Sequence, residues 1–415
     1  MSSFAAPRSL RFQIGIFGRR NVGKSSLLNA LTRQDVSLVS DVAGTTTDPV
    51  QKPMELQPLG PVSFIDTAGI DDEGELGRLR VLRSHRVTEQ VDMALLVVAD
   101  AWGEPERALL GELKGRQTPV VVVFNQQDRI TVDAEVIDEV ESLGLSYCRV
   151  SATSGWGLLE LREAIVDAAP TDHAASAGIL AGLVQPGQTL VLVVPIDKEA
   201  PKGRLILPQV QTLRDALDSH ALCMVVRERE LRAALMQLKQ PPGLVITDSQ
   251  AFLRVAGDVP PEVPLTSFSI LFARHRGDLA TQIQGTLALD RLRPGDKILV
   301  AEACTHHPIG EDIGRVKIPR WITQYVGGRL QFTTLQGRDF PDDLSDFQLV
   351  VHCGACMLTR REMANRLDRC RAAKVPVTNY GLVIARSLGI FERALEPFPE
   401  AWSVFDHGTP NPEPS

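Results

Sequence analysis

Two groups of residues in this 415-residue chain could do chemistry, one near each end. The first is Gly-Arg-Arg-Asn-Val-Gly-Lys-Ser, residues 18–25, whose glycines are spaced to turn backbone N–H groups around phosphate oxygens. The second is Cys304-Thr305-His306, followed after 45 residues by His352-Cys353-Gly354-Ala355-Cys356. Thiolates and imidazoles are ligands for soft metals and iron–sulfur clusters. Together the groups predict a protein that binds both a nucleotide and a metal.

The glycine-rich group lies between an apolar strand-like run, Phe12–Phe17, and a helical pattern, Lys24–Thr32, which is the context that a phosphate-binding loop requires. We expect the Lys24 ammonium to reach the β and γ phosphates and the Ser25 hydroxyl to ligate Mg²⁺. The start of the helix adds the positive end of its dipole. The phosphate-binding residues are therefore predicted to be Gly18, Asn21, Gly23, Lys24, Ser25 and Ser26.

Three further groups follow apolar strand-like runs and indicate guanine as the base. Asp66-Thr67-Ala68-Gly69 places a carboxylate where it can hold Mg²⁺ through water and a Gly69 N–H where it can sense the γ-phosphate. In Asn125-Gln126-Gln127-Asp128, the Asp128 carboxylate can accept two hydrogen bonds from guanine, an edge that adenine lacks. The Ala152 N–H in Ser151-Ala152-Thr153 can donate to guanine O6. We therefore expect GTP and GDP as ligands, with base contacts from Asn125, Asp128, Ser151 and Ala152.

This region resembles the TrmE/Era group of GTPases. Gly44-Thr45-Thr46-Thr47-Asp48 is similar to their switch I, and the resemblance implies that Thr46 ligates Mg²⁺ and acts with Lys24, Asp66 and Gly69 in hydrolysis. Gln126 departs from the group's Lys. Ile70 stands where Ras-like enzymes have a water-orienting Gln. The resemblance implies that K⁺, held partly by Asn21, supplies the missing charge, so we expect K⁺-stimulated hydrolysis of GTP to GDP and phosphate.

Composition restricts the alternatives. The net charge of −7 disfavours nucleic acid as a partner, and no segment approaches the ~20 apolar residues of a membrane span. The start of the chain has no signal-peptide pattern, so we expect a cytoplasmic protein. Six cysteines are too few for a disulfide scaffold of this length. Cys148, Cys223 and Cys370 belong to no motif and are expected to be inert, partly buried thiols.

Both cysteine groups end strand-like runs, Lys297–Ala303 and Phe347–His352, so they are expected to meet at one edge of a sheet. The Cys-x-x-Cys pair of Cys353 and Cys356 puts two thiols on one turn. On chemistry alone the group is consistent with an iron–sulfur cluster, with tetrahedral zinc held by three Cys and one His, or with a redox dithiol. His307 lies outside the pattern and is expected to be a solvated or hydrogen-bonded histidine.

Behind a GTPase region, this cysteine and histidine pattern resembles the HydF family of [FeFe]-hydrogenase maturation GTPases. The resemblance implies a [4Fe–4S] cluster ligated by Cys304, Cys353 and Cys356, with His306 or His352 as a possible fourth ligand. It also implies a scaffold that accepts a diiron precursor from radical-SAM maturases and delivers it to apo-[FeFe]-hydrogenase. The alternative function is a tRNA- or ribosome-associated GTPase with a structural metal, which the net acidity disfavours.

Alternation of strand-like and helix-like runs predicts an α/β protein with three α/β domains. We expect a GTPase domain with a doubly wound, mostly parallel sheet at 1–172, a dimerisation domain at 173–264, a cluster-binding domain at 265–398 and a disordered tail at 399–415. The middle domain has strand-like runs at 189–196 and 244–247 and no chemical motif. It could be a structural spacer, but an open sheet edge invites a second chain, so we expect a homodimer or a larger assembly.

Overall fold

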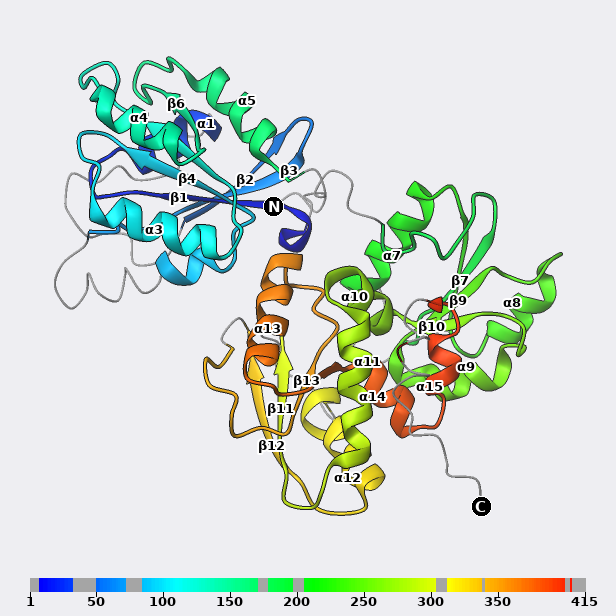
Figure 1. The fold of residues 1–415 in the computed structure, drawn as a ribbon. Coiled ribbons are helices and arrows are strands. Elements are labelled where there is room, and N and C mark those ends of the chain that lie inside the picture. Colours follow the sequence, from blue (N-terminus) through cyan, green and yellow to red (C-terminus); the bar gives the residue numbers. More distant parts are fainter. Residues whose placement is uncertain are drawn as a thin grey trace. The chain divides into compact units, whose positions relative to one another are not determined.

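The computed structural model describes residues 7–32, 50–71, 84–170, 178–196, 205–303, 312–337 and 340–399, together with residue 404. The chain divides into two compact units, residues 1–176 and 177–415. Both units alternate strands and helices, which confirms the predicted α/β class (Figure 1). In the described part of the chain, no helix is both long enough and apolar enough to cross a lipid bilayer.

The first unit contains a six-stranded sheet with the order β2-β3-β1-β4-β5-β6. All neighbours are parallel except β2 and β3, which confirms the predicted doubly wound, mostly parallel arrangement. The last strand ends at Arg149, just before Ser151 and Ala152. The strands are β1 (Phe12–Phe17), β2 (Val50–Leu56), β3 (Gly60–Asp66), β4 (Met93–Val98), β5 (Val120–Phe124) and β6 (Ser146–Arg149).

Helices cover both faces of this sheet, because every side chain of β4 and β5 is apolar and buried. Val121 and Val123 of β5 pack in one core with α1 (Lys24–Thr32) and α5 (Leu158–Ala168). Val122 and Phe124 pack on the opposite face with α3 (Glu104–Gly115) and α4 (Ala134–Ser142). Residues 84–88 form a further helical turn, and η1 (Arg8–Leu10) precedes β1.

The second unit contains two parallel four-stranded sheets. The first has the order β10-β9-β7-β8, so β8 is an edge strand. Its strands are β7 (Thr189–Val193), β8 (Leu222–Val226), β9 (Leu244–Thr247) and β10 (Leu265–Ser267). The helices of this part are α7 (Leu207–Asp218), α8 (Leu231–Gln237), η2 (Ser249–Ala251), α9 (Phe252–Asp258) and α10 (Phe268–Arg276).

The second sheet has the order β12-β11-β13-β14. Its strands are β11 (Lys297–Glu302), β12 (Gln331–Gln336), β13 (Leu349–His352) and β14 (Val377–Asn379). The surrounding helices are α11 (Leu279–Leu287), η3 (Ala288–Arg291), η4 (Ile313–Lys317), α12 (Ile318–Val326), α13 (Arg360–Ala372), α14 (Tyr380–Ser387) and α15 (Phe391–Leu395). Gly389, which adopts a left-handed φ of +73°, separates α14 from α15.

The end of the chain completes the core of the first sheet of this unit. Leu382, Phe391 and Phe398 pack in the same core as β7, β9 and β10. The Thr266 hydroxyl of β10 donates a hydrogen bond to the carbonyl oxygen of Ala394 at 3.2 Å. The core therefore joins residues on both sides of the expected boundary at 264, and the boundaries at 172, 264 and 398 stay a prediction. Of the expected tail, only residues 399 and 404 are described.

Candidate nucleotide and metal sites

The glycine-rich loop between β1 and α1 is held in a conformation that only glycine fits at two positions. The φ angles of Gly18 and Gly23 are +146° and +88°. A Cβ atom on Gly18 would lie 2.2 Å from the carbonyl oxygen of Val97, and one on Gly23 would lie 2.4 Å from Asn125 Nδ2. The loop therefore lies in close contact with β4 and with the residue that follows β5, and a side chain at either glycine would clash there.

Hydrogen bonds fix the side chains of the lysine and serine at the start of α1. Lys24 Nζ donates to the carbonyl oxygens of Gly18 at 2.9 Å and Arg19 at 2.7 Å, which holds the ammonium over the loop. Ser25 Oγ donates to Asp66 Oδ2 at 2.6 Å. Burial raises the pKa of Asp66, while the Ser25 hydroxyl and Lys24 oppose that rise. Asp66 Oδ1 is buried and accepts no hydrogen bond from the described residues, so an oxygen donor set that fits Mg²⁺ is present.

The segment after β3 returns to the glycine-rich loop. Gly69 is buried, and a Cβ atom there would lie 3.0 Å from the backbone nitrogen of Arg20. The Ile70 N–H donates to the carbonyl oxygen of Gly18 at 3.2 Å. The Ile70 side chain packs against the core under α3. Because it carries no polar atom, it cannot orient a water molecule. Thr46 and the rest of the stretch that is similar to switch I, residues 44–48, lie outside the described residues.

Asn125 joins the two loops that are predicted to hold the phosphates and the base. Its side chain is 1% exposed. Asn125 Nδ2 donates to the carbonyl oxygen of Val22 at 2.9 Å, and Asn125 Oδ1 accepts from the Ala152 N–H at 3.1 Å. Gln126, which has a left-handed φ of +61°, donates from Nε2 to the carbonyl oxygen of Asn21 at 2.8 Å. Both amide side chains therefore tie the end of β5 to the glycine-rich loop.

Asp128 is oriented by a serine from the next loop. Ser151 Oγ donates to Asp128 Oδ1 at 2.7 Å and accepts from the Ser154 N–H at 3.2 Å. The Ser151 hydrogen bond lowers the pKa of Asp128, so the carboxylate stays ionised at neutral pH. An ionised carboxylate can only accept hydrogen bonds, which is the property required to recognise the two N–H groups of guanine. The loops that follow β5 and β6 bring together Asp128, Ser151 and Ala152 at one edge of the sheet.

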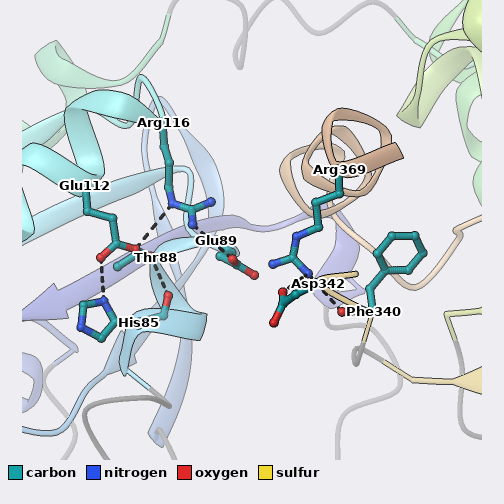
Figure 2. Close-up of polar contacts among 8 residues, drawn as sticks. All are labelled: His85, Thr88, Glu89, Glu112, Arg116, Phe340, Asp342 and Arg369. Carbon is teal, nitrogen blue, oxygen red and sulfur yellow. Dashed lines mark hydrogen bonds and ion pairs between the residues drawn. The ribbon is translucent and has the colours of Figure 1, made fainter. Parts of the chain in front are cut away.

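The helical turn at 84–88, downstream of the Asp66–Gly69 segment, is tied to α3 (Figure 2). His85 Nδ1 lies 2.6 Å from Glu112 Oε2, and the Thr88 hydroxyl donates to Glu112 Oε1. Arg116 donates to Glu89 Oε1 at 3.1 Å. A second contact of this kind was not expected from the sequence: Arg19 binds the buried Glu106 of α3 through two hydrogen bonds of 2.8 Å. No spacing rule pairs residues 87 positions apart.

In the second unit, the Cys-x-x-Cys pair lies in the loop from β13 to α13. β11 and β13 are adjacent and parallel, and Cys353 Sγ accepts a hydrogen bond from the Ala303 N–H at 3.1 Å. Ala303 directly precedes Cys304, which lies outside the described residues together with Thr305, His306 and His307. The Leu358 N–H donates to the carbonyl oxygen of Ala355 at 3.0 Å and closes a turn around Cys356.

Burial dominates the ionisation of both described cysteines of this motif. Burial raises the pKa of Cys353, although N–H groups of Ala303 and Ala355 lower it. Burial raises the pKa of Cys356 to about 12. Both are therefore thiols at neutral pH, and binding of a metal would release their protons. Two thiols in one turn, one of them facing N–H donors, fit the donor chemistry of an iron–sulfur cluster or of zinc.

His352 is fully buried, and both of its ring nitrogens have partners. Nδ1 donates to the carbonyl oxygen of Cys353 at 2.9 Å, and Nε2 accepts from Arg366 Nη1 at 2.8 Å. Burial and the Arg366 charge lower the pKa of His352 to about 3, so the ring is neutral. His352 would have to leave Arg366 before Nε2 could bind iron.

Two arginines of α13 secure the loops at this end of the sheet. Arg366 also donates from Nη2 to the carbonyl oxygen of Gly337 at 3.0 Å. Arg369 Nη1 donates to the carbonyl oxygen of Phe340 at 3.1 Å and lies 3.2 Å from Asp342 Oδ1 (Figure 2). Neither residue carries a sequence signal, because basic residues in a helix usually face water. Among the described residues, no three His, Cys, Asp or Glu side chains are grouped closely enough to bind a metal ion.

The three unaffiliated cysteines are buried or half-buried, as expected for thiols outside a motif. Burial raises the pKa of Cys148, that of Cys223 to about 11 and that of Cys370 to about 12. Neutral thiols are weak nucleophiles.

Three family models match the chain. Residues 13–126 match a 50S ribosome-binding GTPase, residues 179–277 match the hydrogen maturase F dimerization domain, and residues 280–397 match the hydrogen maturase F tetramerization domain. The last two matches together span more than half of the chain.

Curated relatives match the first unit. A tRNA modification GTPase MnmE from Synechococcus sp. (strain JA-3-3Ab) is 37% identical over 163 residues, which are 37% of this chain and 33% of the relative. GTPase Der from Campylobacter concisus (strain 13826) is 37% identical over 158 residues, 36% of this chain and 34% of the relative. The chain therefore spans about a third of the length of these relatives.

Solved structures also match the chain. The G domain of the T. maritima FeoB iron transporter is 25% identical with a TM-score of 0.30, and the match covers 38% of this chain and 98% of that domain. Aquifex aeolicus Era is 22% identical with a TM-score of 0.35, covering 60% of this chain and 99% of that protein.

Proposed function

Because the chain belongs to the hydrogen maturase F family, we propose that it is a scaffold that carries a diiron precursor to apo-[FeFe]-hydrogenase. Its N-terminal unit is a GTPase domain, which hydrolyses GTP to GDP and phosphate. The observation that carries the proposal is the presence, in one chain, of a phosphate-binding loop and of a buried cysteine pair at a strand end. A plain electron carrier would have no use for the GTPase domain.

In this proposal, Cys304, Cys353 and Cys356 hold a [4Fe–4S] cluster. When bound, the cluster supplies one iron with an exchangeable coordination position, which suits reversible attachment of the diiron cargo. The protein holds Cys353 Sγ in place through the Ala303 N–H, and the closed turn of residues 355–358 holds Cys356. His306 and His352 stay candidates for the fourth ligand, but the bond from Arg366 to His352 Nε2 disfavours His352.

The GTPase site would act through positioned charge. Lys24 would move from the loop carbonyls to the β and γ phosphates, and Ser25, Asp66 and Thr46 would hold Mg²⁺. The Asn21 side chain is exposed on the loop, where its amide oxygen can bind K⁺. GTP state would then control partner association through switch I and the residues after Gly69.

The protein is an oligomer in this proposal, as the names of its two matched C-terminal families imply. The β8 edge of the first sheet in the second unit is the interface that we favour for a dimer. Leu222 and Val225 on β8 are 61% and 42% exposed, and an edge strand offers unpaired backbone groups to a second copy. Further partners would be the radical-SAM maturases, and the cytoplasm would be the compartment.

The test is transfer of the cargo. The full-length protein is loaded anaerobically with its cluster and a diiron precursor and mixed with apo-[FeFe]-hydrogenase, and hydrogen evolution is measured. We expect activity with the wild type and none with Cys304→Ser or Cys353→Ser, while Cys223→Ser, a change outside the motif, should keep activity. Transfer that survives loss of Cys304 and Cys353 would refute the carrier function.

One observation favours a second function: the first unit matches a family described as a 50S ribosome-binding GTPase. A GTPase that acts on tRNA or the ribosome should bind RNA with an affinity that falls steeply as salt rises. A cluster-loaded wild type that fails to activate hydrogenase but shows such RNA binding would favour this alternative.

A further inference from the structure

Arg276 is the last residue of α10 and is only 3% exposed. Burying a guanidinium group normally costs several kcal/mol unless the protein surrounds it with acceptors and compensating charge. The contacts of Arg276 show which part of the protein this buried charge holds in place. Its neighbour on the same helix, Arg274, is only half-buried.

Arg276 holds the exit of the cysteine loop. Its Nη1 donates to the carbonyl oxygen of Leu358 at 3.0 Å, and Leu358 closes the turn that contains Cys356. Its Nη2 lies 3.4 Å from Gln211 Oε1 of α7, and its guanidinium carbon lies 6.0 Å from the ring centroid of Phe272. The side chain is thus fixed from α7 and α10 and reaches the loop from that side.

Arg276 also brings a positive charge to the second cysteine. Burial lowers the pKa of Arg276 to about 10, so it stays protonated at neutral pH, and the proximity of Cys356 opposes that shift. Leu358, whose carbonyl oxygen accepts a hydrogen bond from the guanidinium at 3.0 Å, follows Cys356 by two residues, so the charge lies beside the turn that contains this cysteine. A buried charge in this position is weakly screened by solvent ions.

We propose that Arg276 is a positioning residue of the cluster site, which holds the cysteine loop through Leu358 and keeps a buried positive charge beside the turn that contains Cys356. This inference rests on the proposed cluster. A fixed cation near an iron–sulfur cluster stabilises the form that carries one more electron, because net charge and hydrogen bonding set the reduction potential. Arg276 would thus affect both retention of the cluster and the ease of its reduction.

The test compares four full-length variants after anaerobic cluster reconstitution: Arg276→Gln, Arg276→Lys, Arg274→Gln and Arg274→Lys. Arg274 is the matched control, because it lies on the same helix, donates to the carbonyl oxygen of Ala181 at 3.0 Å and stacks on Phe398 at 5.9 Å. The measurements are iron and sulfide per chain, the reduction potential from a titration followed by EPR, and the rate of iron loss to a chelator.

We expect Arg276→Gln to give a more negative potential and several-fold faster iron loss than the wild type. Arg276→Lys should restore the potential, because it keeps the charge, and both Arg274 variants should match the wild type. An unchanged potential and iron retention in Arg276→Gln would overturn the inference, as would an equal shift in Arg274→Gln. If Arg276→Gln binds no cluster, cluster binding by Arg276→Lys would support the inference. Failure of Arg276→Lys to bind the cluster, while Arg274→Lys binds it normally, would refute the inference.

Hydrogen exchange of residues 354–359 in the cluster-free protein separates this inference from the proposed function. Without the bond from Arg276, the Leu358 amide should exchange faster in Arg276→Gln than in Arg274→Gln. A wild type that binds no cluster would refute the proposed function, and the exchange result would still decide whether Arg276 holds the loop. Equal exchange in the two variants would show that it does not.

Discussion

Replacement of Asn125 by Ala should loosen the whole nucleotide site, because this side chain joins two loops of the first unit. The variant removes the donor to the Val22 carbonyl at 2.9 Å and the acceptor of the Ala152 N–H at 3.1 Å. Leaving a buried polar group without a partner costs about 1–3 kcal/mol, and Ala152 is only half-buried, so we expect a total loss of roughly 2–4 kcal/mol. For a unit of this size the melting temperature should fall by roughly 5–15 °C.

Two measurements on the full-length protein check this value. Hydrogen exchange of β5 reports the free energy of opening of the first unit, and titration with a fluorescent GDP analogue reports affinity. We expect exchange to become faster by a factor that corresponds to roughly 2–4 kcal/mol, and GDP affinity to fall at least about tenfold. Gln127→Ala is the matched control, because the side chain of this half-buried neighbour makes a single hydrogen bond to the described residues, a long one of 3.5 Å to the Asn125 carbonyl.

The reasoning would be refuted if Asn125→Ala and Gln127→Ala showed the same exchange rates and melting temperatures. Loss of GDP affinity with unchanged stability would also contradict it. That result would mean that Asn125 acts on the ligand alone and does not join the loops.

Three further outcomes are expected. Gln126→Lys should keep the contact with the Asn21 carbonyl and add a charge, which strengthens such a bond by about 1 kcal/mol. The melting temperature of the first unit should therefore rise by roughly 2–4 °C, and an unchanged or lower value would contradict this. Asp66→Asn should abolish hydrolysis and raise the melting temperature at pH 7, because burial raises the pKa of Asp66 and the ionised carboxylate therefore destabilises the folded state. This gain in stability should vanish below the unfolded pKa of about 3.9, and a gain that persists there would refute the explanation. Leu222→Lys on the β8 edge should convert dimers into monomers in sedimentation experiments. The control Met236→Lys, on α8 and 80% exposed, should leave the assembly intact, and dissociation by both variants or by neither would argue against the edge interface.

Much of the first unit could be predicted because its signals are local. The run Phe12–Phe17 is a strand as predicted, since a run with five apolar or small residues of six before a glycine-rich loop favours a buried strand. β2 was not predicted, because its alternating pattern includes Pro53 and polar residues and its pairing depends on the adjacent β3. The edge strand β8 was missed for a similar reason, since only its pairing with β7 distinguishes Leu222–Val226 from a short apolar loop.

The sequence by itself determined the α/β class and the position of each chemical group at the end of a strand, because motif residues are defined by spacing along the chain. It placed Asp128, Ser151, Cys353 and Cys356 in named loops. Only the tertiary structure decided which distant residues hold those loops: Asn125 between two loops of the first unit, and Arg276 and Arg366 around the cysteine turn. Such contacts join residues tens of positions apart, and they exist only after packing has excluded water and made an unpaired polar group costly.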